Sequence, residues 1–176
     1  MGQVVSVNVA VPRVLVRRGR EVRTGLWKRP AAGRVRVHEL GLAGDLVGDL
    51  RIHGGRDKAV YAYAYEDTEW WEAELGRDLG PGFFGENLTL RGIDASGALA
   101  GERWAVGAAL LEVTEPRTPC WKLAEKAGEP GFMKRFLAAG RSGTYLRVVI
   151  EGGVAAGDEA RVLSRPRRSS RSPAPA

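Results

Sequence analysis

The sequence predicts a mainly β protein with helices (α+β), in which a small closed β-barrel carries peripheral helices. Three observations lead to this prediction. Short apolar or alternating runs recur along most of the 176 residues, only three runs have helical character, and the length is that of one domain. Many short strands at close spacing favour a closed or strongly curved sheet.

The expected strands are short and follow one another closely. Residues 58–65 read KAVYAYAY, so tyrosines lie on one face of a strand and alanines on the other. Gly107 separates two of the runs and predicts a hairpin. The predicted strands are Val4–Val9, Gly33–His38, Leu50–His53, Lys58–Tyr65, Asn87–Arg91, Arg103–Val106, Ala108–Val113, Tyr145–Ile150 and Glu159–Leu163.

Three helices are expected from their start and stop signals. The first follows an acidic cap at Glu66 or Asp67, and tryptophans 70 and 71 with Leu75 supply its buried side. The third has a proline in its first turn, and a glycine follows the end of each helix. The predicted helices are Asp67–Leu75, Trp121–Lys126 and Pro130–Ala139.

The net charge of +6 is concentrated at the C-terminus. Residues 164–176 hold four arginines and no acid, whereas residues 1–163 carry 23 basic against 21 acidic side chains. We therefore expect a folded domain over 1–163 and a disordered basic tail over 164–176. Four charges are a weak signal for nucleic acid, so no nucleic-acid partner is predicted.

No apolar run approaches the ~18 residues of a membrane span, and the first residues do not form a signal peptide. The expected location is cytoplasmic, without a membrane partner. The oligomeric state is not determined by the sequence, which leaves a homodimer open.

The only cysteine, Cys120, lies in a loop that reads TEPRTPCWK over residues 114–122. Pro116 and Pro119 stiffen this loop, and the helix expected after it presents N–H groups to an anion. Arg117 and Lys122 add positive charge nearby, which favours the reactive, metal-binding thiolate. A small buried hydrophobic cysteine is the structural alternative. A metal on Cys120 would take its other ligands from a bound molecule, because the chain has no Cys/His zinc spacing.

Two glycine-containing turns carry further candidate ligands. Residues 48–58 contain Gly54 and Gly55 among cations, and His53 and Lys58 could grip phosphate or a metal-oxo group. Residues 82–87 place an acid and the amide of Asn87 where a strand begins. On local sequence alone, an ordinary solvated turn is the favoured interpretation of the first segment and a capped turn that of the second. Neither the GxGxxG nor the GxxxxGK[ST] phosphate motif is present.

Together these segments resemble the MOSC domain, named for the C-terminal domain of molybdenum-cofactor sulfurase, and more closely its YiiM-like branch. The resemblance spans nearly all of residues 3–163, and its motifs occur in the family order. The resembling residues are Asp49–Tyr63, Phe84–Thr89, Leu110–Leu123, Lys134–Phe136, Gly143–Val148 and Gly153–Asp158.

The resemblance implies a MOSC-type β-barrel that binds the molybdenum cofactor (molybdopterin). It implies Cys120 as the molybdenum ligand and catalytic residue, with His53, Lys58, Asn87 and Arg117 around the cofactor. Similar proteins reduce N-hydroxylated compounds such as amidoximes and hydroxylaminopurines. Electrons would come from an external reductase, because the chain shows no flavin or iron–sulfur motif.

Two alternatives stay open at this point. Cys120 could carry sulfur as a persulfide, which would make the protein a sulfur carrier or sulfurtransferase. The domain could also carry the cofactor without turnover. Many YiiM-like chains continue in a helical extension after the barrel, and here a basic tail follows instead.

Overall fold

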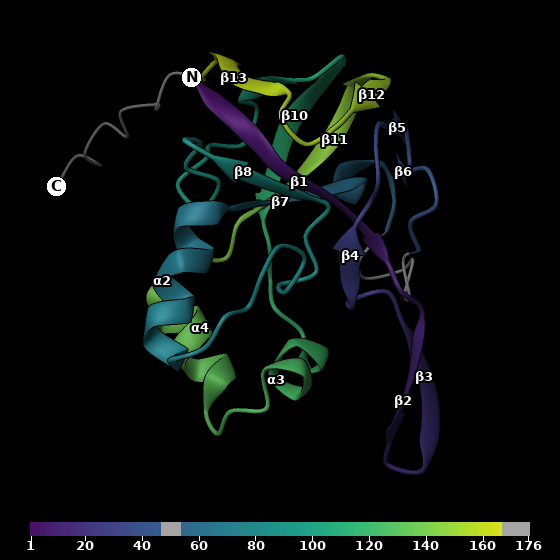
Figure 1. Ribbon diagram of the computed structural model, residues 1–176, viewed down its shortest axis with the longest axis vertical. Coiled ribbons are helices and arrows are strands. Elements are labelled where there is room, and N and C mark those ends of the chain that lie inside the picture. Colours follow the sequence, from purple (N-terminus) through teal and green to yellow (C-terminus); the bar gives the residue numbers. More distant parts are fainter. Residues whose placement is uncertain (47–53, 167–176) are drawn as a thin grey trace, which may run out of the picture.

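The computed structural model describes residues 1–46 and 54–166. Seven strands close into a barrel in the order β13, β9, β10, β11, β7, β8, β1, with β1 pairing again to β13 (Figure 1). Among the described strand pairs β7–β8 alone is parallel, and β4 adds to the far end of β1. These strands are β1 (Gly2–Ala10), β4 (Lys28–Pro30), β7 (Val60–Ala64), β8 (Leu88–Arg91), β9 (Arg103–Val106), β10 (Ala109–Pro116), β11 (Thr144–Ile150) and β13 (Glu159–Ser164). The predicted closed β-barrel with helices is confirmed.

Strand β7 separates two hydrophobic cores. Val60, Ala62 and Ala64 face the barrel interior, whereas Tyr61 and Tyr63 belong to a second cluster under the helices. The predicted alternation of tyrosine and alanine is therefore confirmed. The strand is shorter than predicted, because Lys58 lies in the 3₁₀ turn η1 (Arg56–Lys58) and Tyr65 already belongs to a helix.

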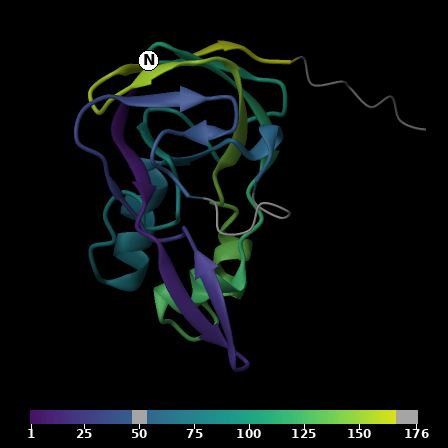
Figure 2. The ribbon, with the colours of Figure 1, turned by 90° about the vertical axis from the view of Figure 1, so that its right-hand side faces the viewer.

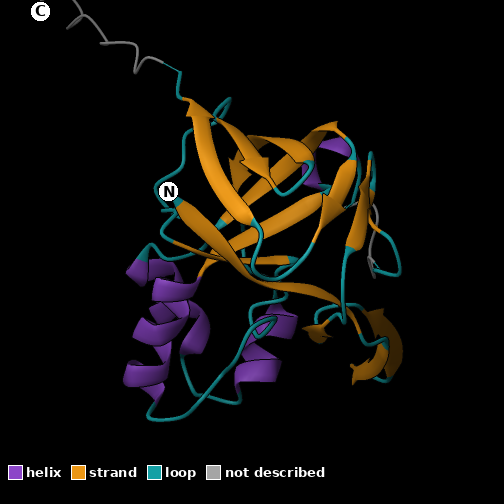
Figure 3. Ribbon diagram, turned by 45° about the horizontal axis from the view of Figure 1, so that its top comes forward, coloured by secondary structure: helices purple, strands orange, loops and turns teal. Residues whose placement is uncertain are grey.

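Three helices, α2 (Tyr65–Leu75), α3 (Trp121–Ala127) and α4 (Phe132–Ala139), lie at one end of the barrel (Figure 3). They enclose an aromatic core in which the rings of Trp71 and Phe136 stack with centroids 5.6 Å apart. Among the described residues, no helix combines the length and the apolar character needed to cross a membrane.

The helix ends were predicted better than the helix starts. Each helix is followed by a glycine with φ between 64° and 67°, a conformation that glycine adopts without strain. Helix α2 begins two residues earlier than predicted, which places Glu66 and Asp67 in its first turn, where carboxylates stabilise the helix dipole. Helix α4 begins at Phe132 and not at Pro130, because Gly131 has a left-handed φ of 69°.

Smaller sheets flank the barrel. Strands β5 (Val35–His38), β6 (Gly41–Leu42) and β12 (Gly152–Val154) form a three-stranded sheet. The predicted strand Leu50–His53 lies outside the described residues. Strand β13 ends at Ser164, one residue past the predicted domain boundary, and residues 167–176 of the predicted tail are likewise outside the described part.

A hairpin that the sequence analysis missed projects from the barrel at the same end as the helices (Figures 1 and 2). It consists of β2 (Arg13–Arg17) and β3 (Arg20–Thr24), joined by Arg18 and Gly19. Both linking residues have positive φ, 51° and 73°. A two-residue turn with this backbone favours Asn or Gly, so an arginine at position 18 is strained.

We expect Arg18→Asn to stabilise the protein by about 1 kcal/mol, because asparagine tolerates the left-handed backbone better than arginine does. Urea unfolding of the variant and the wild type measures the difference. A variant with an unchanged or lower urea midpoint would contradict a strained Arg18.

Candidate functional site

Two adjoining chambers lie between the barrel, the loop that carries Cys120 and the β2–β3 hairpin. The inner chamber has a volume of about 80 Å³ and the outer chamber about 790 Å³. Lys58, Cys120, Lys122 and Tyr145 line both chambers. These four residues therefore mark the boundary at which the chambers meet.

Four of the five predicted site residues line the inner chamber, namely Lys58, Asn87, Arg117 and Cys120. They come from η1, from the start of β8 and from the loop between β10 and α3. The fifth, His53, lies outside the described residues. The structure thus brings together residues that are far apart in the sequence, and their roles stay predictions.

Cys120 is half-buried and forms the N-cap of α3, as the sequence predicted for its position. The backbone holds the loop at both sides. The N–H of Arg117 donates to the carbonyl of Gly143 (3.1 Å), and the carbonyl of Cys120 accepts from the N–H of Leu123 (3.0 Å). The thiol is therefore held at a fixed place where the two chambers meet.

The Arg117 side chain is the most unusual feature of the inner chamber. It is 5% exposed, and its Nε and Nη1 atoms have no hydrogen-bond partner among residues 1–46 and 54–166. Its guanidinium carbon lies 4.9 Å from the centroid of the Tyr61 ring. Burial alone would lower the pKa of Arg117, but the nearby Tyr61, Tyr145 and Cys120 raise it, so the group stays charged. A buried, charged donor without a partner is costly and indicates a site for an anion.

A buried network fixes the wall of the inner chamber. The ammonium of Lys28 donates to both carboxylate oxygens of Asp45, at 2.7 and 2.6 Å. Asp45 also accepts from the N–H of Ala10 (2.7 Å) and from Nδ2 of Asn87 (2.7 Å). Burial lowers the pKa of Lys28, and Asp45 counteracts part of that shift. Neither Lys28 nor Asp45 was anticipated, since no local motif connects them.

The predicted amide at position 87 is engaged at both ends. Its Oδ1 accepts from the N–H of Tyr61 (3.1 Å), while its Nδ2 donates to Asp45. Asn87 thus ties β7 to the Lys28–Asp45 pair and positions the chamber wall.

The acid predicted beside Asn87 supports a turn. Glu86 is fully buried, and its Oε1 accepts from the N–H of Gly82 (2.5 Å) and the hydroxyl of Thr89 (2.8 Å). Burial raises the pKa of this carboxyl. Lys126 donates to the carbonyl of Gly82 (3.1 Å), and burial lowers its pKa to about 8. Glu86 and Lys126 therefore hold the segment that leads into Asn87.

Lys58 lies at the boundary and forms an ion pair with Glu115, at 3.0 Å between Nζ and Oε1. Its ammonium is also 5.7 Å from the centroid of the Tyr145 ring. Partly exposed ion pairs contribute only about 0–1 kcal/mol. Replacing Glu115 by a bound anion as the partner of Lys58 therefore costs little free energy.

Protein ligands for a metal are few here. Within the described part of the chain, no group of three or more His, Cys, Asp or Glu side chains could hold a metal ion. A metal bound by the Cys120 thiolate would need further ligands from a bound molecule, and a soft thiolate suits a metal that is already held by sulfur.

Comparison with known proteins identifies the family and agrees with this fold. A family model described as the MOSC domain matches residues 49–161. A closed barrel with a cysteine at the edge of a cationic cavity is thus the form that this family takes here, and the chain belongs to the MOSC domain family.

Within that family the chain is YiiM-like. The crystal structure of YiiM from Geobacillus stearothermophilus superposes with a TM-score of 0.75 at 35% identity, covering 93% of this chain and 76% of that one. The uncharacterized protein YflK of Bacillus subtilis is 38% identical over 92% of this chain and 73% of its own length. A protein of Gibberella moniliformis named "Reductase" is 32% identical over 84% of this chain, but only 27% of that protein is covered.

We expect Asp45→Ala to destabilise the protein by about 3–5 kcal/mol, because it leaves the buried ammonium of Lys28 without its counterion. Urea unfolding measures the loss. The control is the double variant Lys28→Met/Asp45→Ala, which should lose clearly less, since no buried charge remains. Equal losses in the single and the double variant would argue against the ion pair as the source of the effect.

Proposed function

We propose that this protein is a molybdenum-cofactor-dependent reductase of N-hydroxylated compounds, with Cys120 as the molybdenum ligand. The observation that carries the proposal is the position of Cys120. Its thiol lies where the inner chamber, which contains the buried Arg117 guanidinium with two nitrogens unpartnered among the described residues, meets the larger outer chamber. Membership of the MOSC family and the relative named "Reductase" support a redox role.

The residues present fit the cofactor. The phosphate of the pterin is an anion, and Arg117 offers it two nitrogens, Nε and Nη1, that lack hydrogen-bond partners among the described residues. The thiolate of Cys120 is a soft ligand for molybdenum. The inner chamber alone is too small for the whole cofactor, but it adjoins the outer chamber, whose 790 Å³ lies in the range of small-molecule sites.

When bound, the cofactor supplies the two electrons that cleave the N–O bond, and a separate reductase restores them. The overall change converts N–OH and two protons into N–H and water. The protein binds and orients the reactants. Burial raises the pKa of Tyr145 above its usual value, so its hydroxyl stays protonated at the boundary and can donate a hydrogen bond to a leaving oxygen. We propose a cytoplasmic setting, without nucleic acid or membrane.

We expect Cys120→Ser to lose molybdenum while the fold persists, because a hydroxyl is a poor substitute for a soft thiolate. Protein from a host that makes the cofactor is assayed for molybdenum and pterin per chain, and circular dichroism checks the fold. A folded variant with normal molybdenum content would contradict the assignment of Cys120 as the molybdenum ligand. A wild-type cysteine heavier by the ~32 Da of one sulfur atom, without molybdenum, would favour the sulfur carrier instead.

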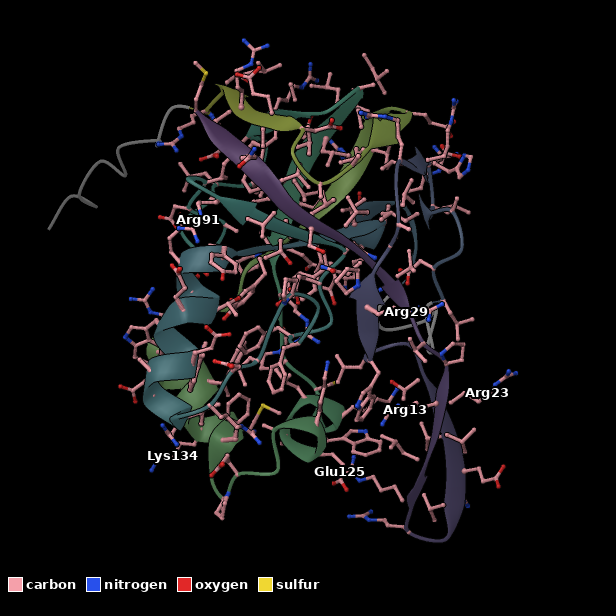
Figure 4. The ribbon with its side chains drawn as sticks, in the orientation of Figure 1. Arg13, Arg23, Arg29, Arg91, Glu125 and Lys134 are labelled. Carbon is pink, nitrogen blue, oxygen red and sulfur yellow. The ribbon has the colours of Figure 1, made fainter. Side chains whose placement is uncertain are left out.

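We expect Lys58→Ala and Arg117→Ala each to weaken cofactor retention by about 1.5–3 kcal/mol, the loss of one charge-assisted hydrogen bond. Pterin occupancy after dialysis is the measurement. Lys134→Ala is the control, since Lys134 lies on α4, far from the hairpin (Figure 4), and lines neither chamber. Unchanged occupancy in both test variants would show that other residues hold the phosphate.

A further inference from the structure

The β2–β3 hairpin presents one of its two faces to the chambers. Arg17 pairs with Arg20 and Leu15 pairs with Val22 across the strands. Of these, Arg17, Arg20 and Val22 line the outer chamber. Because side chains alternate along a strand, the neighbouring residues belong to the opposite face.

Arg23 lies on that opposite face. It pairs with Val14, which is 53% exposed. Figure 4 shows Arg13 on the side of the hairpin that faces α3 and Arg23 on the other side, pointing away from the protein. The hairpin therefore offers an inward and an outward arginine on the same strand, Arg20 and Arg23.

The outer chamber is strongly cationic. Arg17, Arg18 and Arg20 from the hairpin line it together with Lys58 and Lys122, and Glu115 is the only carboxylate in its described lining. Glu115 is already paired with Lys58. A cleft lined by one sign of charge concentrates ions of the other sign.

The strained turn adds an independent observation. Arg18 has a φ of 51°, which is unfavourable for arginine, and it lines the outer chamber. Strained residues of this kind collect at functional sites. Asparagine would fit the backbone conformation of this turn better than arginine does. We therefore attribute the presence of an arginine at position 18 to its positive charge.

The hairpin also contacts the residue that follows Cys120. The guanidinium carbon of Arg17 lies 4.3 Å from the centroid of the Trp121 ring, and Trp121 directly follows Cys120. Trp121, Pro119 and Val22 give the same chamber an apolar part. A ligand with a flat apolar body and an anionic end would match both parts.

We infer that the outer chamber binds the substrate and selects N-hydroxylated compounds that carry a phosphate or carboxylate, which the arginines of the hairpin recognise. This inference rests on the proposed reductase function for the reaction at Cys120. It assigns Arg18 and Arg20 as specificity residues, a role separate from that of Arg117 in the inner chamber.

The test compares three probes, namely benzamidoxime and its 4-carboxylate and 4-phosphonate derivatives. We expect the cofactor-loaded wild type to reduce the two anions with higher kcat/KM than the neutral probe, with a preference that falls as salt rises. Arg20→Gln should lower the anion-to-neutral ratio of kcat/KM about tenfold, mainly through KM. Arg23→Gln, which removes the same charge from the outward face, should keep the wild-type ratio.

Binding is measured separately by calorimetry with the phosphonate probe and no electron donor. The expected result is a dissociation constant raised about tenfold by Arg20→Gln, and more by Arg18→Asn/Arg20→Gln, but not by Arg23→Gln. Equal effects of Arg20→Gln and Arg23→Gln would overturn the inference. A fall of molybdenum content in Arg20→Gln would also overturn it, because the hairpin would then hold the cofactor's own phosphate.

The same data separate the inference from the proposed function. A loaded wild type that reduces none of the three probes, but binds the phosphonate through Arg20, contradicts the reductase and supports the anion site. A wild type that reduces all three probes equally well contradicts the anion site and supports the reductase. A stronger effect on the phosphonate than on the carboxylate would identify phosphate as the preferred group.

Discussion

The buried charge of Arg117 is the constraint on which the rest of the site depends. Two of its nitrogens, Nε and Nη1, lack hydrogen-bond partners among the described residues, and the side chain is almost completely buried. Of the acids near it, Asp45 is paired with Lys28, whereas Glu86 holds a turn through Oε1 and its Oε2 has no hydrogen-bond partner among the described residues. Lys28 and Lys126 have pKa values lowered by burial, which reflects the same unfavourable environment for cations. The region is short of negative charge, and an anionic cofactor would supply it.

The barrel explains how the buried charge of Arg117 is held in place. Strand β7 has both faces buried, one in the barrel core and one against the aromatic core under the helices. Its backbone N–H at Tyr61 is bound by Asn87, which also reaches Asp45. The chamber wall is therefore tied to a strand that is buried on both faces, which can hold an energetically unfavourable buried charge in place. The hairpin, in contrast, is mostly exposed, and three of its arginines line the outer chamber.

Features that depend on neighbouring residues in the sequence were predicted from the sequence pattern. The alternation of tyrosine and alanine along β7 and the glycines that follow the helices were predicted correctly, but the strand predicted over residues 58–65 was too long at both ends. The hairpin was missed because Arg18-Gly19 lacks the usual Asn-Gly or Asp-Gly signal, and residues 13–24 do not alternate between apolar and polar side chains. The Lys28–Asp45 pair was also missed, since only the fold brings the start of β4 next to Asp45. Lys58, Asn87 and Arg117 were found through the family resemblance, and His53 lies outside the described residues.

The most direct measurement is the free energy of unfolding of cofactor-free protein, wild type against Arg117→Met, in urea. The account predicts that the variant is as stable as the wild type, or more stable by up to about 4 kcal/mol, because methionine removes an unpaired buried charge and keeps much of the volume. A loss of about 3 kcal/mol or more would contradict it, since the guanidinium would then already be satisfied within the protein and would not await an anion.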